Sequence, residues 1–158
     1  MKSRVVLADD HKVFREAMRS MLERDPSIEV IGEAGDGTEA LDLVGSVHPD
    51  VVVMDVRMPG VNGIAALRQL IAAHPRVKVI VLSVTSEPIF ASEMLGAGAC
   101  GYVTKGDAGE LPRAIHAVLS DSNYLSTEVA AMVADSADTG KSINDASYVG
   151  VKRKASKP

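Results

Sequence analysis

The sequence is poor in cysteine and in aromatic residues. Its single cysteine, Cys100, excludes an internal disulfide and any metal site built on several cysteines. A reducing, cytoplasmic setting is the simplest fit to this usage. Three Tyr, two Phe and no Trp argue against an aromatic platform for stacking single-stranded nucleic acid. No apolar run approaches the roughly 20 residues that a membrane-spanning helix needs, so we expect no transmembrane segment.

Charge is unevenly distributed along the 158 residues. The formal net charge is −4, but residues 1–140 carry 12 Lys or Arg against 20 Asp or Glu, and residues 141–158 carry five against one. An acidic body therefore precedes a basic tail. Hydrophobic residues make up 46% of the chain and charged residues 24%, which is typical of a globular domain and not of a disordered chain.

Short apolar runs alternate with segments of helical periodicity. The runs span residues 5–8, 28–34, 51–54, 77–82 and 100–103, and the helical segments span residues 13–22, 36–44, 64–71, 87–95 and 111–119. Strands that are apolar on both faces and alternate with helices indicate a parallel sheet covered on both sides. We therefore expect an α/β domain with a doubly wound, five-stranded parallel sheet.

The boundaries follow from the same pattern. We expect one domain over residues 1–121, a linker-like helix within residues 122–137, and a flexible basic tail over residues 138–158, where periodicity is lost. Asp36 is expected to cap a helix as part of a capping box, and Asp107 or Gly109 to start the last helix of the domain.

Polar residues end four of the apolar runs. Asp9 and Asp10 follow the first run, Asp55 the third and Ser83 the fourth, and Lys105 follows the fifth closely. Open α/β sheets bind ligands at the carboxyl ends of their strands. We therefore expect three carboxylates, a hydroxyl and a lysine to converge on one edge of the sheet.

These side chains together could bind a metal ion and react with a phosphoryl group. Three neighbouring carboxylates repel one another unless a cation joins them, and an all-oxygen ligand set suits Mg²⁺ better than zinc. One carboxylate, aided by that ion and a lysine, could attack phosphorus and become an acyl phosphate. Each acid taken alone is as well explained as a helix cap or turn former. The joint pattern is much harder to obtain by chance.

The motifs around these residues resemble those of response-regulator receiver domains of two-component systems. The matching segments are Asp9-Asp10-His11, Asp55 with Pro59-Gly60, Ser83, and Gly101 to Lys105, in the family's order over residues 3–120. The first and last segments look most like the NarL type, in which a helix-turn-helix DNA-binding domain follows the receiver. The resemblance implies a flavodoxin-like fold with strand order 2-1-3-4-5.

The resemblance also implies roles. Asp55 would accept a phosphoryl group from a sensor histidine kinase or a phosphotransfer protein, so the chain would be a switch rather than an enzyme with turnover. Asp10, Asp55 and the Arg57 carbonyl would bind Mg²⁺, with Asp9 acting through water. Lys105 and Ser83 would bind the phosphoryl group, and Ser83 and Tyr102 would move on activation. A homodimer would form through the first and last helices.

The sequence departs from the receiver-domain pattern in places, and an alternative enzymatic function must be weighed. Gly106 follows Lys105 where chemotaxis-type receivers have proline, and the tail cannot form a helix-turn-helix with its own core. We therefore expect a stand-alone receiver, a natural truncation or a fragment of a DNA-binding transcriptional regulator, with nucleic acid bound only through an output domain. An Asp-nucleophile phosphatase is disfavoured, because Arg57 stands where such enzymes carry a second Asp as general acid.

Overall fold

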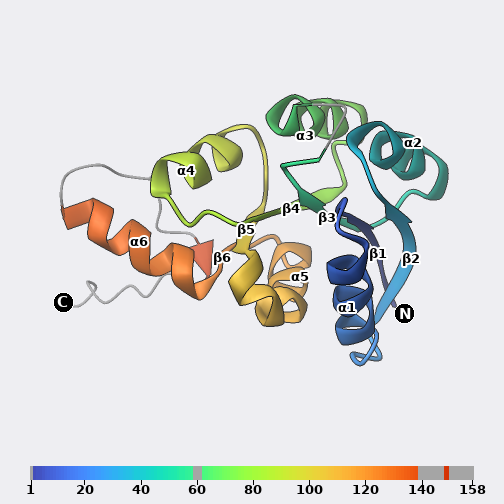
Figure 1. The fold of residues 1–158 in the computed structure, drawn as a ribbon, viewed down its shortest axis with the longest axis horizontal. Coiled ribbons are helices and arrows are strands. Elements are labelled where there is room, and N and C mark those ends of the chain that lie inside the picture. The colour runs from blue at the N-terminus through green and yellow to red at the C-terminus, as the bar shows by residue number, and fades with distance from the viewer. Residues whose placement is uncertain (1, 59–61, 139–147, 150–158) are drawn as a thin grey trace.

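The computed structural model describes residues 2–58, 62–138 and 148–149 (Figure 1). The strands are β1 (Ser3–Ala8), β2 (Ile28–Ala34), β3 (Val51–Asp55), β4 (Lys78–Ser83), β5 (Gly101–Thr104), β6 (Asn123–Leu125) and β7 (Tyr148–Val149). The helices are α1 (Lys12–Leu22), α2 (Gly37–Val47), α3 (Gly63–Ala73), α4 (Pro88–Gly96), α5 (Leu111–Leu119) and α6 (Thr127–Asp138), with a 3₁₀ helix, η1 (Lys105–Glu110), before α5. Among the described residues, no helix is both long and apolar enough to cross a membrane.

The strands form one parallel sheet in the order β2-β1-β3-β4-β5-β6-β7. The predicted α/β class and the order of the first five strands are confirmed. The prediction of five strands is wrong, because β6 and the two-residue β7 extend the sheet beyond β5. The three residues of β6 are too few to show a periodicity, although Tyr124 and Leu125 are buried against β5.

Helices cover both faces of the sheet, with α1 and α5 on one side and α2, α3 and α4 on the other (Figure 1). Successive strand residues face opposite layers: Val5 and Leu7 pack in the α1 and α5 layer, while Val6 and Ala8 pack in the opposite layer. Residues of α6 join the second layer. This two-sided burial explains why the strands read as continuous apolar runs.

Two expected helix caps have different outcomes. Asp36 caps α2 as predicted, since its carboxylate accepts the Glu39 N–H at 2.8 Å, and Glu39 in turn accepts the Gly35 N–H at 2.6 Å. Asp107 does not cap α5. It lies inside η1, and its Oδ2 accepts the Glu128 N–H at 2.8 Å in the first turn of α6. The prediction for Asp107 is wrong because its partner lies across the fold rather than three residues ahead.

The C-terminal predictions meet the structure only in part. The segment expected as a linker-like helix begins with strand β6 before α6 starts at Thr127. Of the expected tail, residues 138, 148 and 149 are described, and the basic residues Lys152, Arg153 and Lys154 lie outside the described residues. The Pro59-Gly60 pair, which the resemblance included, also lies outside them.

Candidate functional site

The polar residues that end the strands lie at one edge of the sheet. Asp55 is the last residue of β3 and Ser83 the last of β4, and the register pairs Asp55 with Leu82 and Ser83 with Thr104. Asp9, Asp55 and Ser83 are all buried. Their common position follows from the parallel sheet, because neighbouring parallel strands end at the same edge.

Lys105 lies between two of the carboxylates. Its Nζ is 2.8 Å from Asp55 Oδ2 and 3.0 Å from Asp9 Oδ2. Burial lowers the pKa of Lys105, but its contacts with Asp55 and Asp9 outweigh burial and raise that pKa above its ordinary value. The ring of Phe14 on α1 lies 4.9 Å from the same nitrogen and adds a cation–π contact. The ammonium is therefore held charged between two buried acids.

Asp55 has one carboxylate oxygen engaged on each side. Oδ2 accepts a hydrogen bond from Lys105, and Oδ1 accepts the Arg57 N–H at 2.8 Å. Val56, the residue after Asp55, lies tightly against the start of α3, because a Cβ at Gly63 would overlap the Val56 carbonyl oxygen. A buried carboxylate fixed by a lysine and a backbone N–H is oriented to act as a nucleophile.

Asp9 offers an oxygen that fits a cation. Oδ1 accepts the His11 N–H at 2.7 Å, whereas Oδ2 accepts no hydrogen bond from the described residues and meets Lys105 only as an ion pair. One ligand atom each from Asp9, Asp10 and His11 lies within 4.8 Å of the others. A buried carboxylate oxygen that has only the Lys105 ammonium as a partner within the described part of the chain, with a second acid beside it, fits a hard divalent ion such as Mg²⁺.

The remaining predicted residues are placed as follows. The Asp10 side chain is partly exposed, and its Oδ1 lies 3.6 Å from His11 Nδ1. Arg57 is exposed and meets Asp55 through its backbone N–H. Lys105 thus contacts both Asp9 and Asp55, Asp10 lies beside His11, and Arg57 meets Asp55.

Ser83 and Tyr102 both form hydrogen bonds with one loop residue, Thr85. The Thr85 N–H donates to Ser83 Oγ at 3.2 Å, and the Tyr102 hydroxyl donates to the Thr85 carbonyl oxygen at 2.8 Å. Tyr102 is fully buried, and burial raises its pKa to about 12. Its ring packs edge-to-face against Phe90, with centroids 6.3 Å apart. One loop residue therefore connects the two residues expected to move on activation.

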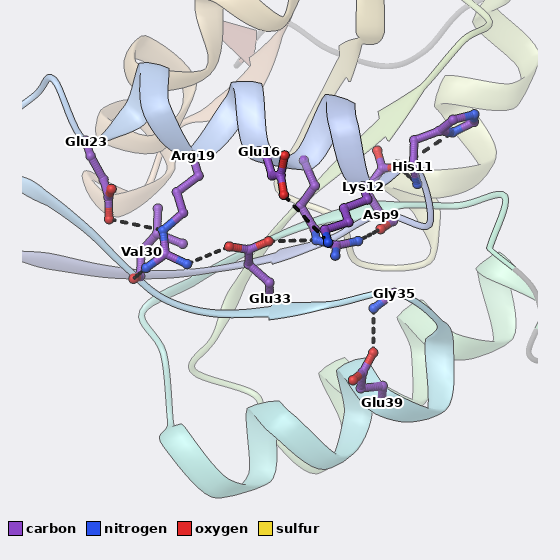
Figure 2. Close-up of polar contacts among 11 residues, drawn as sticks. Asp9, His11, Lys12, Glu16, Arg19, Glu23, Val30, Glu33, Gly35 and Glu39 are labelled. Carbon is purple, nitrogen blue, oxygen red and sulfur yellow. Dashed lines mark hydrogen bonds and ion pairs between the residues drawn. The ribbon is translucent and has the colours of Figure 1, made fainter.

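A group of charged residues missed from the sequence lies on α1 and β2 (Figure 2). Glu33 of β2 accepts hydrogen bonds from Arg15 and Arg19 of α1, and Arg15 also donates to the carbonyl oxygen of Asp9. The available signal was the charge of Glu33, which strand β2 shares with Glu29. Periodicity alone does not reveal its partners.

Comparison with known proteins gives a consistent result. Residues 5–116 match the model of the response regulator receiver domain. The chain is 39% identical over 132 residues to response regulator GacA of Pseudomonas viridiflava, and 40% identical over 129 residues to transcriptional regulatory protein DegU of Brevibacillus brevis. The matches cover 83% and 81% of this chain but only 62% and 55% of those proteins.

Solved structures agree with the sequence comparisons. A LuxR-family response regulator from Aurantimonas sp. SI85-9A1 superposes with a TM-score of 0.83 at 36% identity, covering 87% of this chain and 99% of that one. The receiver domain of the putative response regulator NarL from Mycobacterium tuberculosis gives a TM-score of 0.71 at 34% identity, covering 75% and 97%. The matched family model, the strand order and the acid edge of the sheet lead to one conclusion: the chain belongs to the response regulator receiver domain family of two-component systems.

Proposed function

We propose that Asp55 accepts the phosphoryl group. The observation that carries this assignment is the Asp55 carboxylate, buried at the edge of the sheet and held by Lys105 and the Arg57 N–H. A carboxylate oxygen attacks phosphorus and forms an O–P bond as the P–N bond of a phosphohistidine breaks. The bonding pair stays on the imidazole nitrogen of the donor, a histidine kinase or a phosphotransfer protein.

Asp9, Asp10, Asp55 and the Arg57 carbonyl would hold Mg²⁺ beside the reacting group. When bound, Mg²⁺ supplies positive charge that offsets the phosphoryl oxygens. Lys105 would contribute a second positive charge, with its Nζ moving from the carboxylates to a phosphoryl oxygen. Ser83 Oγ donates a hydrogen bond to another phosphoryl oxygen.

The added charge acts as a switch. A phosphoryl group brings about −1.5 to −2 charge and three strong acceptors. Drawing Ser83 toward it changes the position of Thr85, whose N–H bonds Ser83 and whose carbonyl holds the Tyr102 hydroxyl. A change at the site therefore changes the position of Tyr102, and with it the surface around α4 and β5. The chain has no second acid at residue 57 to serve as a general acid, so we propose a switch and not an enzyme with rapid turnover.

Partners and setting belong to the same proposal. The switch works in the cytoplasm with a histidine kinase or phosphotransfer protein, and its output includes a homodimer through α1 and α5. The relatives GacA and DegU are longer than the segment matched here. DegU is named as a transcriptional regulatory protein. That name favours a second candidate function, the receiver part of a DNA-binding regulator, in which nucleic acid is bound by an output domain.

Incubation with acetyl phosphate and Mg²⁺, followed by intact mass spectrometry, tests the proposal. Wild type is expected to gain one phosphoryl group, with acetate as the leaving group. Asp55→Asn is expected to gain none, and chelation of Mg²⁺ should suppress the wild-type adduct. Equal adduct formation by Asp55→Asn, or none by wild type, would overturn the assignment.

A further inference from the structure

Arg15 links the end of strand β1 to strand β2. One of its terminal nitrogens donates to the Asp9 carbonyl oxygen, and its Nε donates to Glu33 Oε1 at 2.8 Å. Figure 2 shows the dashed contacts that lead from Glu33 toward Asp9. The Arg15 side chain is only 15% exposed. A planar guanidinium that donates in two directions from a mostly buried position is a geometric constraint and not only a charge.

The residue that Arg15 holds sits at the start of the acidic pair. Asp9 lies one residue beyond the end of β1, and its N–H donates to the Ala34 carbonyl oxygen at 3.0 Å. Its carbonyl oxygen receives Arg15. The backbone of Asp9 is therefore fixed from β2 through its N–H and from α1 through its carbonyl. The Asp9 carbonyl belongs to the peptide bond between Asp9 and Asp10, so the directions of both side chains depend on its orientation.

Arg15 is itself fixed by Glu33. Hydrogen bonds from Arg15 and then Arg19 hold the pKa of Glu33 below its ordinary value, so this carboxylate stays ionised. Arg19 donates to Glu33 Oε2 at 2.5 Å and to the Val30 carbonyl oxygen at 3.2 Å. Arg15 itself is held by the other oxygen, Glu33 Oε1, and this contact leaves its guanidinium little freedom to leave Asp9.

We propose that Arg15 is a positioning residue for divalent-cation binding: through the Asp9 carbonyl it sets the geometry of the Asp9-Asp10 pair, with Glu33 as its anchor. This inference rests on the proposed function, in which the acidic pair holds Mg²⁺. Outer groups that orient metal ligands typically contribute 10–100-fold in metal affinity. The loss of Arg15 is therefore expected to weaken Mg²⁺ binding about 10-fold.

The sign of the effect separates positioning from electrostatics. Arg15 carries a positive charge close to a site for a cation, so removing a mere charge would tighten Mg²⁺ binding. Loss of a positioning contact weakens it. Arg15→Gln removes both the charge and the guanidinium, whereas Arg15→Lys keeps the charge and loses the two-directional donor geometry. We expect both variants to bind Mg²⁺ more weakly than wild type.

The test is the Mg²⁺ dissociation constant of the full chain, measured by calorimetric titration at physiological ionic strength. Arg19→Gln is the matched control. It also removes one positive charge from α1 and one hydrogen bond to Glu33, but Arg19 has no hydrogen bond to Asp9. We expect its dissociation constant to stay within about twofold of wild type, because charges on exposed side chains are screened. Amide exchange of His11, whose N–H is bonded to Asp9 Oδ1, should accelerate in Arg15→Gln and not in Arg19→Gln.

The outcomes are distinguishable. If wild type binds no Mg²⁺, the proposed function fails at the step of Mg²⁺ binding, and the role of Arg15 is overturned as well. If wild type binds but Arg15→Gln binds equally or more tightly, or Arg19→Gln loses as much affinity, the positioning role alone is overturned. If Arg15→Gln fails to fold, Arg15→Lys decides by the same criterion.

Discussion

Removing the charge of Lys105 should destabilise the protein unless a metal ion replaces it. Lys105 Nζ lies 2.8 Å from Asp55 Oδ2 and 3.0 Å from Asp9 Oδ2, and the two acid side chains are 4% and 0% exposed. In Lys105→Met the apolar stem is largely retained, but two buried carboxylates face each other without the intervening cation. Breaking a buried ion pair in this way is costly because uncompensated charge is left behind.

The magnitude follows from the geometry. Both oxygens contact one nitrogen, so they lie no more than about 6 Å apart, and two unit charges at that distance repel by about 3 kcal/mol at an effective dielectric constant of about 20. For a protein of this size, 1 kcal/mol lowers the melting temperature by about 2–4 °C. We therefore expect Lys105→Met to melt about 6–12 °C below wild type in the absence of divalent ions.

Thermal unfolding by circular dichroism, with chelator and then with saturating Mg²⁺, measures both parts of the effect. Mg²⁺ should raise the melting temperature more in Lys105→Met than in wild type, because the ion no longer competes with the ammonium. Lys78→Met is the control: its Nζ pairs with Asp121, whose side chain is 85% exposed, and such pairs contribute at most about 1 kcal/mol. The reasoning is refuted if, in the absence of Mg²⁺, the melting temperature of Lys105→Met equals those of wild type and Lys78→Met.

Three further predictions concern other parts of the molecule. Hydrogen bonds from Ser27, with a histidine on α5, lower the pKa of Asp25 to about 2. Because the pKa of this carboxyl is near 3.9 in the unfolded chain and lower in the folded protein, the ionised Asp25 stabilises the fold above about pH 4, and this stabilisation is lost as the pH falls to about 2. The melting temperature of Asp25→Asn should therefore fall less than that of wild type between pH 5 and pH 2. Tyr102→Phe should lower the free energy of unfolding by about 1 kcal/mol in urea titration, because the Thr85 carbonyl oxygen loses its donor; an unchanged midpoint would contradict this. Glu110→Ala should speed amide exchange in the first turn of α6, where Glu110 accepts a backbone N–H, without changing exchange in α3.

Much of the site could be predicted from the sequence, because parallel strands carry their last residues to a common edge. Asp9, Asp55, Ser83 and Lys105 each end or closely follow an apolar run, and in the structure they lie at that edge. Their placement at this edge needed only the order of the apolar runs and the parallel sheet that they imply. The roles of these four residues, of Asp10 and of the Arg57 carbonyl stay predictions.

The contacts missed from the sequence depend on how elements pack. Whether Arg15 reaches Asp9 depends on the rotation of α1 over β1 and β2, which hydrophobic periodicity fixes only within a broad apolar stripe. Asp107 was expected to cap the helix that follows it in sequence, but in the structure it bonds the first turn of α6. Strand β6 is three residues long, and a segment so short carries no period. These contacts are tertiary and leave little local signature.

The most direct test of the account is to locate the phosphoryl group. Wild-type protein treated with acetyl phosphate and Mg²⁺ is reduced with borohydride, which converts an acyl phosphate of aspartate into homoserine, and is then digested for peptide mass analysis. The account predicts that homoserine appears at position 55, at no other aspartate, and only when Mg²⁺ is present. Modification at Asp9 or Asp10 with Asp55 intact would contradict it.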